Sequence, residues 1–153
     1  MDIVNVLKEP EINLIEQLIE LSKYDFLREE LTEKFLEIYF EKIIKKNRLI
    51  LDIQNKLNTL IGYIEYWNIN FEQLGRLLCK EKFNIFEENI TDGLICYVAN
   101  VTVHPNYRFS NSINRMKKRL FELNNYSQYF VGERNKRYNP IKIFSGRKVS
   151  QHV

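Results

Sequence analysis

Residues 101–113 have the types and spacing of an anion site. An apolar run leads into a proline-bearing turn, an arginine, a short polar loop and then a helical pattern. A strand that enters a helix through such a loop brings free backbone N–H groups and the positive helix end to one place, which favours phosphate. The sequence therefore predicts a phosphate site here, with the hydroxyls of Ser110 and Ser112 as further donors and a helix cap.

His104 follows the same apolar run directly, at the mouth of any pocket beside it. Histidine titrates near neutral pH, so this side chain is a candidate acid or base, the alternative being an exposed loop histidine. No Ser–His–Asp or Cys–His spacing supports a nucleophilic mechanism, and no C-x-x-C or histidine cluster indicates a metal site. Cys79 and Cys96 are predicted to be buried free thiols of a reducing compartment.

The charge is distributed unevenly along the chain. Residues 104–153 hold 11 Lys/Arg against 2 Asp/Glu, whereas residues 1–103 hold 12 against 18. A basic final third indicates an anionic partner: a nucleotide-like cofactor, an acidic carrier protein or nucleic acid. The basic stretch 115–119 can serve any of these, and the alternative is an ordinary solvated face. No stacked-aromatic RNA motif or recognised DNA-binding motif occurs, which disfavours direct reading of nucleic acid.

The composition is that of a folded protein. Of 153 residues, 44% are hydrophobic and 13% aromatic, which excludes a disordered chain and predicts one domain over residues 1–153. No apolar run approaches the ~18 residues of a membrane span. The first ten residues lack the basic-then-apolar plan of a signal peptide, so the cytoplasm is the expected location.

Two helices are expected in the first third of the chain. Pro10 at a first helical position predicts a helix to about residue 23, with apolar residues on one face. Thr32 is the predicted cap of a second helix, whose core-facing residues recur at the spacing of a broad apolar stripe. These stripe residues are Phe35, Leu36, Tyr39, Phe40, Ile43 and Ile44.

Strands dominate the remainder. Alternating and β-branched residues predict a hairpin from 48–54 and 60–67, with a polar turn at 55–58. Residues 94–103 are the strongest strand pattern and are expected at the centre of the sheet, followed by a helix over 112–123. A short helix at 71–83 and further strands at 127–132 and 141–144 complete an α+β fold.

This order of elements, together with residues 60–67 and 94–119, resembles the GNAT family of N-acyltransferases. The resemblance implies a first strand over residues 2–7 and a mixed central sheet flanked by helices. In that family the loop after the central strand binds the pyrophosphate of coenzyme A. Arg108 falls on the Arg/Gln position of its motif, while Asn111 and Ile113 fall where the family has glycines. Asparagine tolerates the left-handed backbone conformation better than other non-glycine residues, so Asn111 can preserve the turn.

The resemblance implies acetyl-CoA or another acyl-CoA as cofactor. It also implies a base that takes the proton of an acceptor amine and an acid that protonates the leaving thiolate. Glu65 resembles the family's base, the alternative being a surface-facing strand residue; Tyr138 resembles the acid, with Tyr126 and Tyr129 as rivals. The cofactor-binding residues implied are Val101, Val103, Arg108, Ser110, Asn111 and Ser112, and the catalytic ones are Glu65, Tyr138 and His104.

A second, weaker resemblance is to toxin-activating lysine acyltransferases, which are GNAT-like and take their acyl group from acyl carrier protein. It covers residues 60–80 and 94–148 and includes the glycine-poor loop. The histidine that those enzymes place near their N-terminus is missing, which argues against their chemistry here.

The function predicted is transfer of an acetyl or other short acyl group from coenzyme A, or from a carrier, to an amine. The alternative is a catalytically inert GNAT-like module that binds a protein or nucleic acid through its basic final third. The small size and the degenerate loop suit a product of a phage or other mobile element, by analogy alone.

Overall fold

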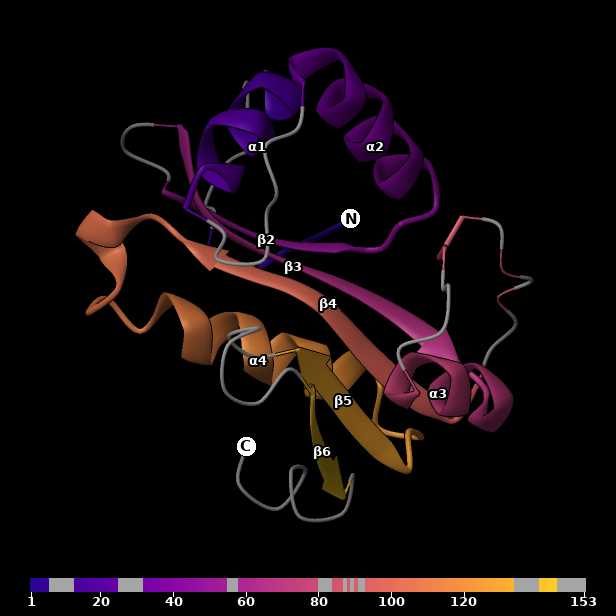
Figure 1. Ribbon diagram of the computed structural model, residues 1–153. Helices are drawn as coiled ribbons and strands as arrows, with labels where there is room; N and C mark the ends of the chain where they lie inside the picture. Colours follow the sequence, from indigo (N-terminus) through magenta and orange to yellow (C-terminus); the bar gives the residue numbers. More distant parts are fainter. Residues whose placement is uncertain are drawn as a thin grey trace. The chain divides into compact units, whose positions relative to one another are not determined.

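The computed structural model shows an α+β fold with a mixed β-sheet (Figure 1). It describes residues 1–5, 13–24, 32–54, 58–79, 84–86, 88, 90, 93–133 and 141–145. The strands are β1 (Asp2–Ile3), β2 (Leu49–Gln54), β3 (Thr59–Ile69), β4 (Ile95–Val103), β5 (Tyr129–Glu133) and β6 (Ile141–Ser145). The helices are α1 (Leu14–Ser22), α2 (Glu33–Lys45), α3 (Phe71–Leu78) and α4 (Ser112–Leu123), with a 3-10 turn at Pro105–Tyr107.

Among the described residues, the six strands are hydrogen-bonded in their sequence order, from β1 to β6. This order puts β4 inside the sheet, as its pattern predicts. The chain forms two compact units: unit 1 holds Met1–Glu65 and Asn100–Leu120, and unit 2 holds Tyr66–Ala99 and Phe121–Val153. The extent of a single domain over residues 1–153 stays a prediction.

In unit 1, β1 pairs in parallel with β2, and β2 pairs antiparallel with β3. The His104 backbone N–H donates to the Ile61 carbonyl at 2.8 Å, and the Asn100 side chain reaches Glu65. Because His104 lies opposite Ile61 while Asn100 lies opposite Glu65, β4 runs antiparallel to β3. This register fixes which residues of the two strands face each other.

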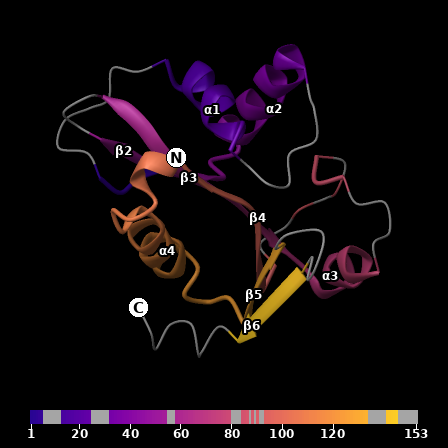
Figure 2. The same ribbon diagram turned by 60° about the vertical axis from the view of Figure 1, so that its left-hand side comes forward.

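Helices cover both faces of the unit 1 strands. Figures 1 and 2 both show α1 and α2 side by side over one face of β2 and β3. The Tyr63 ring meets the α2 ring of Phe40 with centroids 5.9 Å apart, so odd-numbered β3 residues face α2. Gly62 faces α4 instead, where Met116 and Ser112 lie nearest to it. With both faces covered, the β3 residues of unit 1 from Leu60 to Glu65 are all buried.

Gly62 lets the first turn of α4 approach the sheet closely. A Cβ atom at this position would lie 2.9 Å from the Met116 Cε, 3.1 Å from the Ser112 Oγ and 3.2 Å from the Thr102 carbonyl oxygen. The first two neighbours belong to α4 and the third to the β4 backbone. A side chain at position 62 would therefore push the start of α4 away from the strands.

Capping residues set where the helices begin. Thr32 accepts a hydrogen bond from the Phe35 N–H at 3.2 Å, which confirms the predicted cap of α2. Asn13 caps α1, and Asn70 forms a reciprocal capping box with Gln73 at the start of α3. Asn47, which follows α2, has a φ of 55° and suits the left-handed end of a helix.

Unit 2 is built on the parallel pairing of β4 with β5, from Ile95 opposite Tyr129 to Val98 opposite Gly132, and on the antiparallel pairing of β5 with β6. Arg76 of α3 donates to both carboxylate oxygens of Glu88. This hydrogen bond lowers the pKa of Glu88. The ion pair therefore ties the chain that follows α3 back onto that helix.

Some predictions were wrong. Cys79 was expected in the core but is exposed at the end of α3, whereas Cys96 is buried as expected. Phe35 was placed on the buried stripe of α2, yet it is 50% exposed because it lies at the edge of that stripe; Leu36, Phe40 and Ile43 are buried. The predicted helix start at Pro10 and the turn at 55–57 lie outside the described residues.

No described helix has the length and apolar content needed to cross a membrane. Within the described ranges, no group of three or more His, Cys, Asp or Glu side chains is arranged to hold a metal ion.

Candidate functional site

The connection between β4 and α4 folds into two successive tight turns. The Tyr107 N–H donates to the His104 carbonyl at 2.9 Å, and the Ser110 N–H donates to the Tyr107 carbonyl at 3.1 Å. The Ser110 hydroxyl also donates to the Tyr107 carbonyl, at 2.6 Å. The sequence prediction of a strand, a tight polar loop and a helix is therefore confirmed, and α4 begins at Ser112 as predicted.

Asn111 has a φ of 64°, which is the left-handed conformation expected of it. Glycine and asparagine are the residue types that adopt this conformation most readily, and Asn111 stands where the motif that the loop resembles has its first glycine. The Arg115 N–H donates to the Asn111 carbonyl at 3.0 Å, which is the first bond of the helix ladder. The N–H groups of residues 112–114 therefore precede this bond and have no intrahelical acceptor.

Asn111 gives a direct test of this loop geometry. Asn111→Ala is expected to lower the free energy of unfolding by ~1 kcal/mol, because alanine lacks the short polar side chain whose local hydrogen bonds make the left-handed conformation tolerable for asparagine. Asn111→Gly should stay within ~0.5 kcal/mol of the parent, since glycine adopts this conformation freely. Urea denaturation of both variants measures the difference. Equal stability of the two variants would contradict a left-handed residue here.

The loop presents Arg108, Ser110 and Asn111 to solvent, and Phe109 beside them is fully exposed. Ser112 differs from the prediction. Its side chain is 1% exposed and lies against Gly62, so its hydroxyl points into the fold and only its backbone N–H belongs to the loop. As the first helical residue it also follows the cap position, so the expected serine cap is not formed by Ser112.

Arg115 of α4 hydrogen-bonds both to the loop and to strand β2. Its Nη1 donates to the Ser110 carbonyl at 2.7 Å, and its Nη2 donates to the Asp52 Oδ2 at 2.9 Å. Asp52 is fully buried on β2. One turn along the helix, Arg119 pairs with Asp2 of β1. Both arginines of the basic stretch therefore bind carboxylates of unit 1, and only Lys117 and Lys118 remain exposed for the anionic partners predicted from sequence.

β4 is more accessible in its middle than at its ends. Val98 to Asn100 are half-buried and Val101 is 39% exposed, although Ile95 to Tyr97 and Val103 are buried. Val101 is therefore open to contact, whereas the Val103 side chain belongs to the core. Only backbone groups of Val103 can contribute to the binding role predicted for it.

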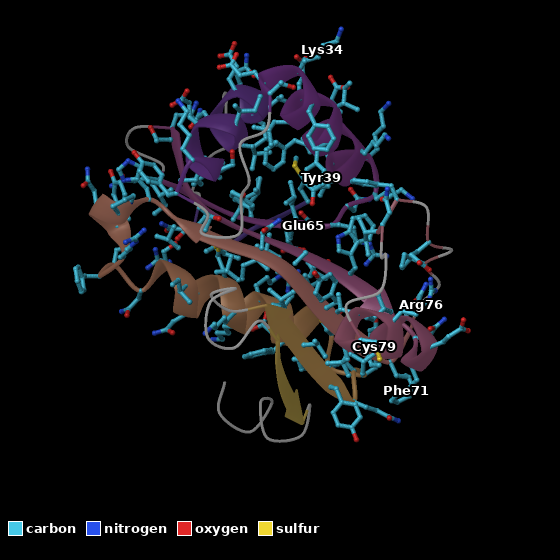
Figure 3. The ribbon with its side chains drawn as sticks, viewed as in Figure 1. Lys34, Tyr39, Glu65, Phe71, Arg76 and Cys79 are labelled. Carbon is cyan, nitrogen blue, oxygen red and sulfur yellow. The ribbon has the colours of Figure 1, made fainter. Side chains whose placement is uncertain are left out.

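Glu65 is buried, at 1% exposure, and the alternative of a surface-facing residue was wrong. Its Oε1 accepts hydrogen bonds from the Tyr39 hydroxyl at 2.6 Å and from the Asn100 side-chain amide at 3.0 Å. Figure 3 shows Tyr39 and Glu65 meeting between α2 and the sheet, while Lys34 points away from α2. Neither partner is predicted from the sequence. Tyr39 has the spacing of the apolar stripe, and its hydroxyl is the one feature that indicates a polar contact.

His104 lies apart from Glu65. It follows Asn100 by four residues, which along an extended strand is ~13 Å. Its Nδ1 accepts a hydrogen bond from the Asn106 N–H at 3.1 Å, and its ring contacts Tyr24 edge-on with centroids 5.0 Å apart. The structure therefore places His104 beside the predicted phosphate loop and away from the buried carboxylate.

The predicted acid, Tyr138, lies outside the described residues. Of its rivals, Tyr126 is exposed, and the Tyr129 ring contacts Phe71 edge-on with centroids 6.3 Å apart. The role of an acid stays a prediction.

The chain matches the solved structure of the loading GNATL domain of CurA from Lyngbya majuscula, with a TM-score of 0.52 and 16% identity. The fold is GNAT-like. The match covers 84% of this chain and 65% of the CurA domain. An acetyltransferase candidate from Staphylococcus aureus MU50 matches with a TM-score of 0.49 and 14% identity, over 86% of this chain and 79% of that one. At these identities the likeness concerns the GNAT-like fold alone.

No family model matches the sequence, and no curated protein sequence matches it either.

Proposed function

We propose that this protein transfers an acetyl or other short acyl group from acyl-CoA to an amine. The observation that carries the proposal is the left-handed Asn111 at the junction of β4 and α4. In a GNAT-like fold this junction is where the family binds the coenzyme A pyrophosphate, and here it keeps the backbone shape without the glycine. The exposed Arg108 next to it supplies a positive charge.

On the donor side, the pyrophosphate would contact Arg108 and the backbone N–H groups of residues 109 and 111–113, since the Ser110 N–H donates to the Tyr107 carbonyl. The positive end of α4 adds to this attraction. The pantetheine arm would then follow the accessible middle of β4, where Val101 is exposed.

On the acceptor side, Glu65 would take the proton of the amine. The amine nitrogen then forms a bond to the thioester carbonyl carbon, the carbon–sulfur bond breaks, and the thiolate leaves with a proton from an acid. Asn100, which donates to Glu65, lies on the strand that would carry the thioester. Glu65 and the acyl carbon would thus meet at one position along β4.

We extend the proposal to the location of the protein and to other partners. Cys79 and Cys96 are free thiols, as in proteins of reducing compartments, and we infer a cytoplasmic location. An acidic carrier protein in place of coenzyme A, or nucleic acid as a partner, would contact cations of the basic final third, of which Lys117 and Lys118 on α4 are exposed.

Calorimetric titration with acetyl-CoA tests the donor half. Arg108→Ala is expected to weaken acetyl-CoA binding by ~1.5–3 kcal/mol, the range for hydrogen bonds to charged groups. Lys34→Ala is the matched control, because Lys34 is an exposed cation on α2, on the opposite face of the sheet from α4 (Figure 3). Equal affinity of parent and Arg108→Ala would move the anion site elsewhere.

Absence of binding in the parent protein would instead favour the inert GNAT-like module. Acetyl-CoA binding without transfer to any class of amine would retain the donor half of the proposal and remove the catalytic half.

A further inference from the structure

The carboxylate of Glu65 is held by residues from two other elements. Tyr39 comes from α2 and Asn100 from β4, and both donate to the same oxygen, Oε1. Tyr39 precedes Glu65 by 26 residues and Asn100 follows it by 35, so only the folded chain brings the three together. This arrangement is a buried polar cluster between α2 and the sheet.

The geometry of the cluster suits an ionised carboxylate. A buried charge is unfavourable unless donors compensate for the lost water, and Glu65 is 1% exposed. The 2.6 Å between the Tyr39 hydroxyl and Oε1 lies within the ~2.5–2.7 Å typical of a hydroxyl that donates to a charged oxygen. Two donors on one oxygen also fix the plane of the carboxylate.

The ring of Tyr39 is itself held in place. It stacks on Phe35 with centroids 6.3 Å apart and meets Phe40 edge-on at 5.7 Å. Phe35 is half-exposed and Phe40 is buried, so the Tyr39 ring contacts one solvent-facing and one core-facing residue of α2. The contacts of the ring with Phe35 and Phe40 therefore orient the hydroxyl toward Glu65.

We propose that Tyr39 is a positioning residue for the base: its hydroxyl holds the Glu65 carboxylate ionised and oriented toward the amine, with Asn100 as the second donor. This rests on the proposed function, in which Glu65 accepts the amine proton. Tyr39 acts through Glu65 and touches neither donor nor acceptor.

The test is Tyr39→Phe, which removes one oxygen and keeps the ring that packs on Phe35 and Phe40. The expected result is a kcat lower by about 10- to 100-fold, the value of one hydrogen bond to a charged group, with the KM for acetyl-CoA unchanged. Tyr24→Phe is the matched control. Tyr24 is exposed, contacts only the His104 ring in the described aromatic pairs, and should give parental kcat.

A double variant separates positioning from a general loss of structure. If Tyr39 acts through Glu65, adding Tyr39→Phe to Glu65→Gln should slow the reaction no further. The proposal is overturned if the rate losses of the two single variants multiply in the double variant. It is also overturned if Tyr39→Phe alone keeps the parental kcat. If Tyr39→Phe does not fold, Asn100→Ala applies the same two measurements to the second donor.

The outcomes also distinguish this proposal from the function on which it rests. Transfer that persists in Tyr39→Phe at the parental rate defeats only the positioning role. A parent protein that binds no acetyl-CoA, or transfers no acyl group to any amine, defeats the proposed function and the positioning role together.

Discussion

Replacing Glu65 with glutamine is expected to slow acyl transfer by ~10²–10⁴-fold, the usual contribution of a positioned base. Glutamine keeps the size of the side chain, and its carbonyl oxygen can still accept the hydrogen bonds from Tyr39 and Asn100. It cannot accept the amine proton. Affinity for acetyl-CoA and the free energy of unfolding should therefore change little, and initial rates over a panel of amines give the measurement.

His104→Ala is the control for this variant, since His104 is the other predicted acid or base and lies about four strand residues from Asn100. We expect its rate to stay near that of the parent. A large loss in His104→Ala with none in Glu65→Gln would transfer the role of base to the histidine. If neither substitution slows a confirmed activity, water deprotonates the amine, and the site acts by aligning amine and thioester.

Arg115→Ala is expected to produce the largest loss of stability, ~3–5 kcal/mol in the free energy of unfolding. Removing the guanidinium leaves the carboxylate of Asp52, which is fully buried on β2, without its cationic partner. The same change releases the Ser110 carbonyl in the loop between β4 and α4, where the phosphate site is predicted. Urea denaturation measures the first effect, and acetyl-CoA titration near neutral pH should show weaker binding as well.

Arg119→Ala provides the comparison. Its partner Asp2 has a side chain 27% exposed, so solvent screens the pair and the expected loss is at most ~1 kcal/mol. Similar losses for the two variants would show that burial of Asp52 does not set the stability of this region.

The local elements were predictable because each has a local cause. The Thr32 cap and the apolar spacing after it indicate α2, and the strand pattern of residues 94–103 matches β4 to within one residue. The left-handed conformation of Asn111 was also predictable, since few residue types tolerate it. What could be predicted of the candidate site was therefore the backbone of the loop between β4 and α4, because neighbouring residues determine its conformation.

The interior of the site was not predictable, because it depends on residues far apart in the sequence. Alternation along β3 cannot tell which face Glu65 occupies, since helices cover both faces of that strand. Tyr39 has the spacing of a core residue, and no residue near it in the sequence indicates a carboxylate partner. The charges of residues 115–119 likewise suggested an external anion, whereas Arg115 pairs with Asp52, 63 residues earlier.

The pairing of Arg119 with Asp2 spans 117 residues, and that of Arg115 with Asp52 spans 63. During synthesis, β1 and β2 leave the ribosome long before α4 exists, at ~5–20 residues per second. For several seconds the face of these strands that α4 later covers has no helix on it, and its carboxylates have no arginine. Unit 1 is thus complete only after α4 has been synthesised. A chain stopped before residue 115 would expose the uncovered face of the sheet to chaperones and proteases.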